Sequence, residues 1–485
     1  MKPNILLIFT DQQRADTIGA LGNKIIRTPA LDRLCREGTA FTSAYSPSPV
    51  CVPGRCSYHY GQYPFNTKCY DNGSPMPSDK PSFMDVLKDN GYLTYGIGKC
   101  HFTPDGKAMR GFTKRETQEE IVKSPKEDDY LKFLFNNGYS HIIDPHGMRG
   151  EMYYVPQPSQ ISAKYHPTQW IGDRSIEFLK SHAKSRNPWM LFSSFIHPHP
   201  PFSPPASWYK MYRAPQMPLP KVPENWQDLI VFINRFQNRY KYRDRGIDIN
   251  LLRCMKAFYY SCISFIDFQI GRMLDELEKS GQIDNTLIIF TSDHGELLGD
   301  YNSFGKRSMH DSCARIPLIA RYPERFRKNS RCRTPASLVD VFPTILESAG
   351  ISSRTFNSDG TDLAKVQELK DRKIFSHFNN AGNGLYMSLD RKWKYFYSAP
   401  DDKEFLFDRI NDPEETRNIL PKNRKSAAEM RDSIICELCR SGEKESVDKN
   451  GWKKYPVRKM PEDPDAGLLI QDHPWAETCQ VLISI

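Results

Sequence analysis

Two strongly apolar runs, far apart in the chain, constrain the fold more than any other feature. Ile5 to Thr10 and Thr286 to Thr291 have the length and the β-forming residues of strands that are buried on both faces. Each run leads directly into an acidic residue and a second potential ligand, Asp11–Gln12 and Asp293–His294. Active sites of open α/β sheets lie beyond the carboxyl ends of the strands, where oxygen ligands suit a hard cation. For Asp11 alone, a helix N-cap is an equally good interpretation.

A third candidate position is the cysteine of Cys51-Val52-Pro53-Gly54-Arg55. Pro53 suits the first turn of a helix, so backbone donors and the positive end of the helix dipole would face Cys51. Such surroundings lower the pKa of a thiol, and Arg55 adds a charge shaped for a tetrahedral oxyanion. This Cys-x-Pro-x-Arg motif resembles the nucleophile motif of the type I sulfatases, in the alkaline phosphatase superfamily. In that family the cysteine is oxidised to formylglycine, whose hydrate is the nucleophile.

The resemblance runs from Asn4 to about Asn418 and implies one divalent metal. The implied ligands are Asp11, Gln12, the modified Cys51, Asp293 and His294. Most members carry Asp where this chain has Gln12 and Asn where it has His294. The resemblance implies Ca²⁺, and the imidazole of His294 makes Mn²⁺ an alternative.

The other matching motifs supply the polar residues of the reaction. In Gly98-Lys99-Cys100-His101, the resemblance implies that Lys99 holds sulfate oxygens and that His101 positions the aldehyde hydrate. It also implies that Arg55 steadies the hydrate, Lys306 contacts sulfate and His199 protonates the leaving group. Without the resemblance, Lys99 and His101 would be read as a surface lysine and a structural histidine. His197 is expected to be auxiliary and His310 structural.

The same resemblance implies an α/β fold with a large, mixed, mostly parallel sheet flanked by helices, like alkaline phosphatase, in residues 1–365. Short strands separated by turns predict a small antiparallel sheet in a C-terminal subdomain, residues 366–485. No structure is predicted for the tail from Glu445. The polar segment from Thr103 to Tyr165 predicts an irregular insertion over the active-site face.

Composition limits the partners and the compartment. The net charge of +9 suits an anionic substrate, but the basic residues are spread out, so nucleic acid is not expected. No apolar run approaches the roughly 18 residues of a membrane span, and the first run is too short for a signal sequence, so we expect a cytoplasmic protein unless a signal was removed. The 12 cysteines are too sparse for a disulfide scaffold, and Cys436 and Cys439 lack a second pair for zinc.

The resemblance implies a hydrolase for a sulfate monoester, whether a sulfated carbohydrate, an aryl sulfate or a small alkyl sulfate. A formylglycine-generating or cysteine-oxidising enzyme is the expected maturation partner. Gln12 and His294 keep a phosphonate monoester or phosphodiester hydrolase open as an alternative. A non-catalytic metal-binding protein with an unmodified Cys51 is the third hypothesis. The sequence does not indicate the substrate or the oligomeric state.

Overall fold

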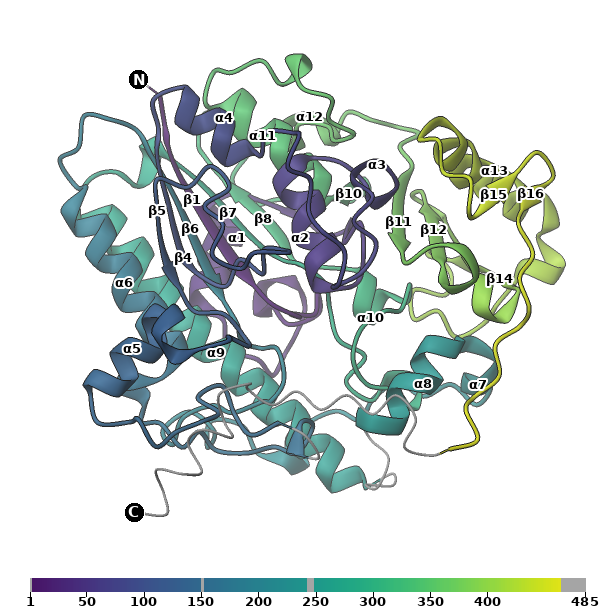
Figure 1. Cartoon of the computed structure of the whole chain (residues 1–485), viewed down its shortest axis with the longest axis horizontal. Coiled ribbons are helices and arrows are strands. Elements are labelled where there is room, and N and C mark those ends of the chain that lie inside the picture. The colour runs from purple at the N-terminus through teal and green to yellow at the C-terminus, as the bar shows by residue number, and fades with distance from the viewer. Residues whose placement is uncertain (1, 150–151, 242–247, 464–485) are drawn as a thin grey trace.

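The computed structural model describes residues 2–149, 152–241 and 248–463, and an eight-stranded sheet forms its centre (Figure 1). The strand order is β5-β4-β6-β1-β7-β8-β2-β9. These strands are β1 (Asn4–Thr10), β2 (Thr39–Phe41), β4 (Leu93–Gly98), β5 (Lys114–Thr117), β6 (Trp189–Phe195), β7 (Thr286–Ser292), β8 (Leu318–Arg321) and β9 (Ser330–Cys332). Strand β8 pairs antiparallel with β7 and β2, and the other pairs are parallel. The prediction of a mixed, mostly parallel sheet is therefore confirmed.

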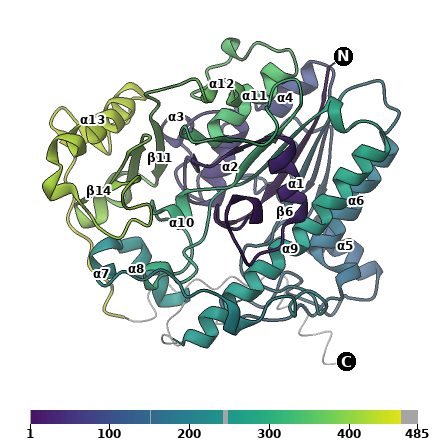
Figure 2. The same ribbon diagram turned by 180° about the vertical axis from the view of Figure 1, so that it is seen from behind.

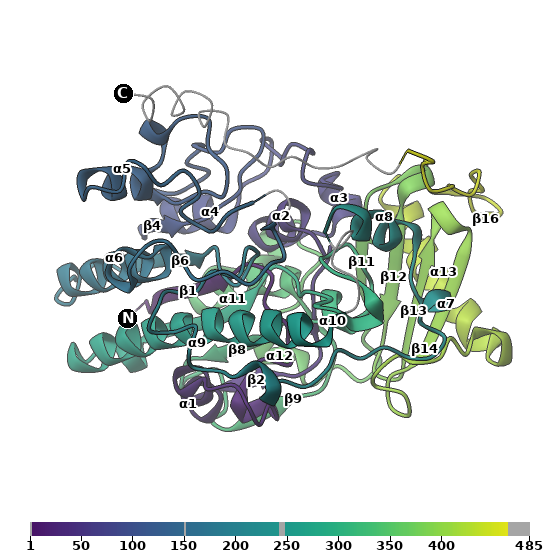
Figure 3. The ribbon, with the colours of Figure 1, turned by 90° about the horizontal axis from the view of Figure 1, so that it is seen from below.

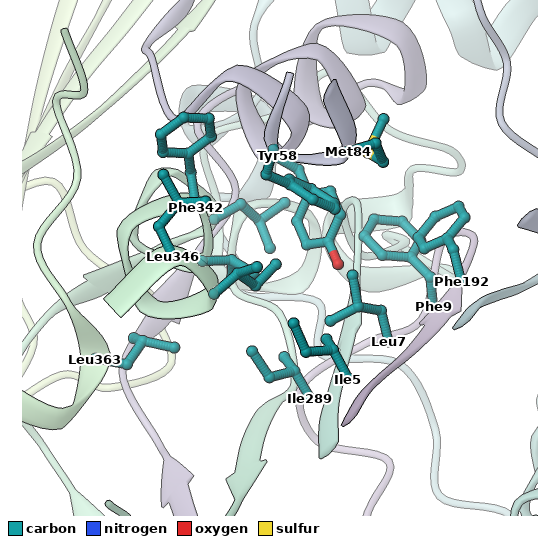
Figure 4. Packing of buried hydrophobic residues seen from close by; sticks show 14 of the residues in the cluster. Ile5, Leu7, Phe9, Tyr58, Met84, Phe192, Ile289, Phe342, Leu346 and Leu363 are labelled. Carbon is teal, nitrogen blue, oxygen red and sulfur yellow. The ribbon is translucent and has the colours of Figure 1, made fainter. Parts of the chain in front are cut away.

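Strand β1 is buried along its whole length because its side chains are apolar on both faces of the sheet. Ile5, Leu7 and Phe9 join one hydrophobic core, and Leu6 and Ile8 join the core on the other side. This alternation follows from the two-residue period of a strand. Figure 4 shows the first of these cores, in which Ile5, Leu7 and Phe9 lie among residues of the sheet and of the helices above it.

Two groups of helices cover the two faces of this sheet. The first core takes residues from α2 (Cys51–Tyr60), α4 (Phe83–Asp89), α11 (Val341–Ser348) and α12 (Leu363–Val366). The second takes residues from α1 (Pro29–Glu37), α5 (Asp129–Asn136), α6 (Pro167–Ser181) and α9 (Ile249–Lys279). Seen from behind, α1, α6 and α9 lie across the sheet (Figure 2). The sheet is thus sandwiched between helices, as its doubly buried strands require.

A smaller antiparallel sheet lies at one end of the molecule (Figure 3). Its strands, in spatial order, are β11 (Ile374–Phe378), β12 (Leu385–Leu389), β13 (Trp393–Ser398) and β14 (Lys403–Asp408). Helix α13 (Arg424–Arg440) packs on one face, and the other face shares a core with Tyr45, Val50 and Met309 of the larger unit. The remaining short elements are α3 (Pro64–Thr67), α7 (Trp226–Leu229), α8 (Phe232–Lys241), α10 (Asp311–Ala314), the pair β3 (Ala44–Tyr45) and β10 (Ala336–Ser337), and the pair β15 (Val447–Asp448) and β16 (Gly451–Trp452).

The prediction that residues 103–165 are irregular is wrong in part. Lys114–Thr117 forms β5 at the edge of the large sheet, and Asp129–Asn136 forms α5. A short edge strand needs no apolar alternation, and Asp128 caps α5 through a hydrogen bond from the Leu131 N–H (3.0 Å). The charged residues of β5, and the charged run 126–129 at the start of α5, explain why the segment was expected to be irregular.

Two other predictions concern the domain boundary and membrane-spanning helices. The division between 1–365 and 366–485 stays a prediction, and part of the C-terminal unit, residues 464–485, lies outside the described residues. Among the helices that the structure describes, none has the length and apolar character needed to cross a bilayer.

Candidate active site

The two acidic strand ends meet because β1 and β7 are neighbouring parallel strands. Thr10 lies opposite Ser292 in the sheet, so Asp11 and Asp293 leave the same edge side by side. Ligand atoms of Asp11, Asp293, His294 and Cys51 all lie within 4.8 Å of one another, and all four residues are buried. The structure therefore brings together a cluster that the sequence places in three distant segments.

Gln12 follows Asp11 and is a candidate for a further oxygen ligand. Its backbone has a φ of 66°, and its N–H donates to Asp293 Oδ1 (3.0 Å). Its Nε2 donates to Glu296, whose carboxylate also accepts from the Tyr154 hydroxyl (2.9 Å). With the amide nitrogen held in this way, the buried Gln12 Oε1 has no hydrogen-bond partner among the described residues. A buried carbonyl oxygen without a partner is costly, so this atom fits a cation ligand.

The imidazole of His294 is oriented as a ligand. Its Nδ1 lies 2.9 Å from the Gly295 carbonyl oxygen, to which it donates when it carries the proton. Nε2 is then unprotonated, 3.4 Å from Cys51 Sγ and 3.9 Å from Asp11 Oδ1. A backbone partner of this kind fixes the tautomer of metal-binding histidines.

Arg55 binds the outer oxygen of each carboxylate. Its Nε donates to Asp293 Oδ2 (3.0 Å) and one terminal nitrogen donates to Asp11 Oδ2 (3.1 Å). The other donates to the Lys99 carbonyl (2.8 Å) and the Ser194 hydroxyl (3.2 Å). The Oδ1 atoms of both carboxylates therefore remain on the side of His294. Arg55 orients the acidic pair, and its predicted role on the aldehyde hydrate stays a prediction.

Cys51 is the first residue of α2, and cationic groups surround its side chain. Lys306 Nζ lies 2.8 Å from Cys51 Sγ, and Asp11 Oδ1 lies 3.8 Å away. Burial opposes ionisation of the thiol, but the charges of Lys306 and Lys99 outweigh it and hold the pKa of Cys51 well below its ordinary value. The helix start predicted from Pro53 is confirmed.

The predicted lysines and histidines lie around the same cysteine. Lys99 Nζ contacts Asp11 Oδ2 (2.7 Å), and Lys306 Nζ contacts His199 Nε2 (3.0 Å). His199 Nδ1 lies 2.7 Å from the Pro200 carbonyl, which leaves Nε2 facing Lys306. His101 has a φ of 53° and its side chain interacts with Cys51.

Two histidines lie elsewhere. His197 packs in a ring cluster with His146 and His166, at centroid distances of 6.4 and 5.1 Å. His310 stacks on Tyr301 (4.2 Å) and lies 3.3 Å from the Glu415 carboxylate, which suits the structural role expected for it.

Sequence reasoning missed three polar residues at this site. Glu296 holds Gln12, while Glu120 and Arg149 reach the site from the segment that follows β5. Glu296 lies three residues after Asp293 in the sequence. This closeness to a candidate metal ligand could have indicated that Glu296 belongs to the site. Glu120 and Arg149 occur in a polar stretch that contains no motif.

Comparison with known proteins indicates the family to which this chain belongs. A family model described as sulfatase matches residues 3–351, and one described as N-sulphoglucosamine sulphohydrolase, C-terminal, matches residues 299–441. An arylsulfatase of Clostridium perfringens is 29% identical over 95% of this chain and 99% of its own. The multifunctional alkaline phosphatase superfamily protein PehA of Trinickia caryophylli is 31% identical over 72% of this chain and 74% of its own.

A solved structure shows the same fold. The phosphonate monoester hydrolase of Agrobacterium radiobacter superposes with a TM-score of 0.77 at 24% identity, over 93% of this chain and 99% of its own. The sulfatase model spans well over half of the sequence. This chain therefore belongs to the sulfatase family of the alkaline phosphatase superfamily.

Proposed function

We propose that this enzyme hydrolyses a sulfate monoester with a nucleophile derived from Cys51, next to one divalent cation. The observation that carries the proposal is the buried cluster of Asp11, Asp293, His294 and Cys51, with Lys306 in contact with the cysteine. A sulfate ester is a tetrahedral anion with a poor leaving group. It needs positive charge at its oxygens, an in-line nucleophile and a proton donor.

The donor set fits a hard cation. Two carboxylates and the imidazole of His294 cluster with the Cys51 side chain. Gln12, next to Asp11, adds a buried amide oxygen that has no hydrogen-bond partner among the described residues. When bound, the cation supplies charge that stabilises the sulfate oxygens and the nucleophile. Oxygen donors favour Ca²⁺, and the imidazole keeps Mn²⁺ as the alternative.

Side chains around the cluster bind the sulfate oxygens, protonate the leaving group and position the nucleophile in this proposal. Lys99 and Lys306 offer ammonium groups to the sulfate oxygens, since both lie beside the cluster. His199 Nε2 faces Lys306 and the cysteine, where a protonated imidazole can donate to the departing alcohol. Cys51 itself is converted to formylglycine by a maturation enzyme in this proposal, and His101, beside it, then positions the aldehyde hydrate.

The second candidate is a hydrolase of phosphonate monoesters or phosphodiesters. The observation that favours it is the presence of Gln12 and His294 in the cluster, where most sulfatases have Asp and Asn. These esters are also tetrahedral and singly charged, so the same cations would bind them.

One experiment separates the hypotheses. Purified enzyme, as isolated and after addition of Ca²⁺ or Mn²⁺, is assayed with para-nitrophenyl sulfate and with bis(para-nitrophenyl) phosphate. A higher kcat/KM for the sulfate supports the proposal, and far lower turnover of the sulfate than of the diester overturns it.

Mass spectrometry of the Cys51 peptide tests the nucleophile, because conversion to formylglycine lowers its mass. An intact thiol in an inactive protein would favour the non-catalytic hypothesis, and Cys51→Ala is the inactive control.

A further inference from the structure

A carboxylate of the chain lies inside the proposed anion site. Glu120 Oε2 is 2.6 Å from Lys99 Nζ, the group proposed to hold sulfate. Its other oxygen contacts an Arg149 terminal nitrogen (2.9 Å) and lies 3.6 Å from His199 Nε2. The side chain is only 11% exposed. An acidic group is therefore buried where a substrate anion has to bind.

Glu120 is ionised in this position. Burial opposes ionisation, but His199, Lys99 and Arg149 outweigh it and hold the pKa of the Glu120 carboxyl well below its ordinary value. The ammonium of Lys99 is therefore already paired with the Glu120 carboxylate before a substrate binds. Asp11 also contacts this ammonium, at 2.7 Å.

The balance of charge in the site shows what one carboxylate changes. Cationic and anionic side chains nearly cancel around Cys51. The cations are Arg55, Lys99, Arg149 and Lys306, and the anions are Asp11, Glu120, Asp293 and Glu296. A divalent cation on the cluster adds two positive charges. Among these anions, Glu120 contacts Lys99, the ammonium proposed to bind the ester, so it lowers the positive charge that a substrate anion meets there.

We propose that Glu120 is a specificity-determining residue that restricts the site to esters carrying a single negative charge. Sulfate monoesters, phosphodiesters and phosphonate monoesters belong to this class. Phosphate monoesters carry nearly two charges above their second pKa of about 6 and are disfavoured by repulsion from Glu120. The inference rests on the proposed function, because it assumes that the ester binds at Lys99 and Lys306.

The experiment compares two esters with the same leaving group. At about pH 8, kcat/KM is measured for para-nitrophenyl sulfate and para-nitrophenyl phosphate with the wild type and with Glu120→Gln and Glu120→Asp. An identical leaving alcohol removes any difference that arises from His199. Glu120→Gln is expected to raise the phosphate-to-sulfate ratio about tenfold or more, because a unit charge a few ångströms away acts at an effective dielectric constant of about 20. Glu120→Asp keeps the charge, and its ratio is expected to stay within about threefold of wild type.

Arg149→Gln changes the net charge of the site in the direction opposite to Glu120→Gln, because it removes a positive charge beside Glu120. It is expected to lower the phosphate-to-sulfate ratio. An unchanged ratio in Glu120→Gln, or the same change in Glu120→Asp, would overturn the inference, since the effect would then not follow charge.

A binding measurement separates this inference from the proposed function. Isothermal titration of the purified proteins with hydrogen phosphate, a dianion, and with perchlorate, a tetrahedral monoanion, requires no turnover. Glu120→Gln is expected to tighten the binding of phosphate relative to perchlorate, and equal changes for both anions would contradict the charge rule. If wild type hydrolyses no ester, the proposed function fails while this comparison still tests Glu120.

Discussion

Replacing Arg55 with methionine tests whether the buried acidic pair is held by one guanidinium. Arg55 has no exposed surface, and its side chain bridges Asp11 and Asp293. Asp11 Oδ2 keeps the ammonium of Lys99 at 2.7 Å in the variant, whereas Asp293 Oδ2 loses the cation at 3.0 Å. The expected cost therefore corresponds to one uncompensated buried carboxylate, about 3–5 kcal/mol of unfolding free energy.

The two other hydrogen bonds of Arg55, to the Lys99 carbonyl and the Ser194 hydroxyl, each add about 1–3 kcal/mol, because the donor is charged and buried. A divalent cation restores part of the loss, because it binds the folded cluster alone. At a concentration of about 100 times its Kd, it contributes about 2.7 kcal/mol. We therefore expect the difference in unfolding free energy between wild type and Arg55→Met to be smaller with the cation than with a chelator.

The assay is urea unfolding followed by circular dichroism, with a chelator and with excess Ca²⁺. Arg33→Met is the matched control, because Arg33 also contacts three carboxylates, those of Glu37, Asp275 and Glu278, but its side chain is 22% exposed. Exposed ion pairs of this kind are worth about 1 kcal/mol or less. If Arg55→Met costs no more than Arg33→Met in the chelator, the account of Arg55 is wrong.

Three further changes test other parts of the site and the fold. His199→Gln is expected to lower kcat/KM for an alkyl sulfate by about 10²–10⁴ but to change para-nitrophenyl sulfate little, because a good leaving group needs no proton; equal losses would exclude a proton donor. Glu296→Gln is expected to weaken cation binding about 10–100-fold in a chelator competition assay, since Glu296 holds Gln12, and unchanged affinity would remove Gln12 from the ligand set. Burial raises the pKa of Asp267 to about 7. Between about pH 4 and 7, the folded state therefore keeps a proton that the unfolded state releases. The free energy of unfolding then falls as pH rises, by at most about 1.4 kcal/mol per pH unit. Asp267→Asn is expected to lack this decline in urea unfolding at a series of pH values, and an equal slope in both proteins would refute it.

The sequence was sufficient where local pattern and sheet geometry act together. Apolar runs predicted β1 and β7, and the rule that parallel strands end at one edge predicted that Asp11 and Asp293 would approach. Lys99 and Lys306 followed from motifs, and both lie at the cluster. These positions were predictable because each residue directly follows, or is in register with, a recognisable segment.

The rest depended on how a polar segment folds over the site. Glu120 lies 21 residues beyond Lys99 and reaches it through β5, an edge strand without an apolar pattern. Arg149 meets Glu120 only in the folded chain. Such contacts arise from tertiary placement, and neither spacing nor propensity encodes them.

Under the proposed function, the contacts of Lys306 would connect maturation of Cys51 to binding of the substrate. In the unmodified chain its ammonium donates to Cys51 Sγ at 2.8 Å and to His199 Nε2 at 3.0 Å. Oxidation of Cys51 to formylglycine removes the sulfur atom and with it one of these two acceptors. A buried ammonium that loses an acceptor needs a new one, and a sulfate oxygen beside the nucleophile supplies it. Under the proposed function, the unmodified thiol would therefore engage Lys306, one of the cations that the substrate requires. The proposed modification would both create the nucleophile and complete the anion site.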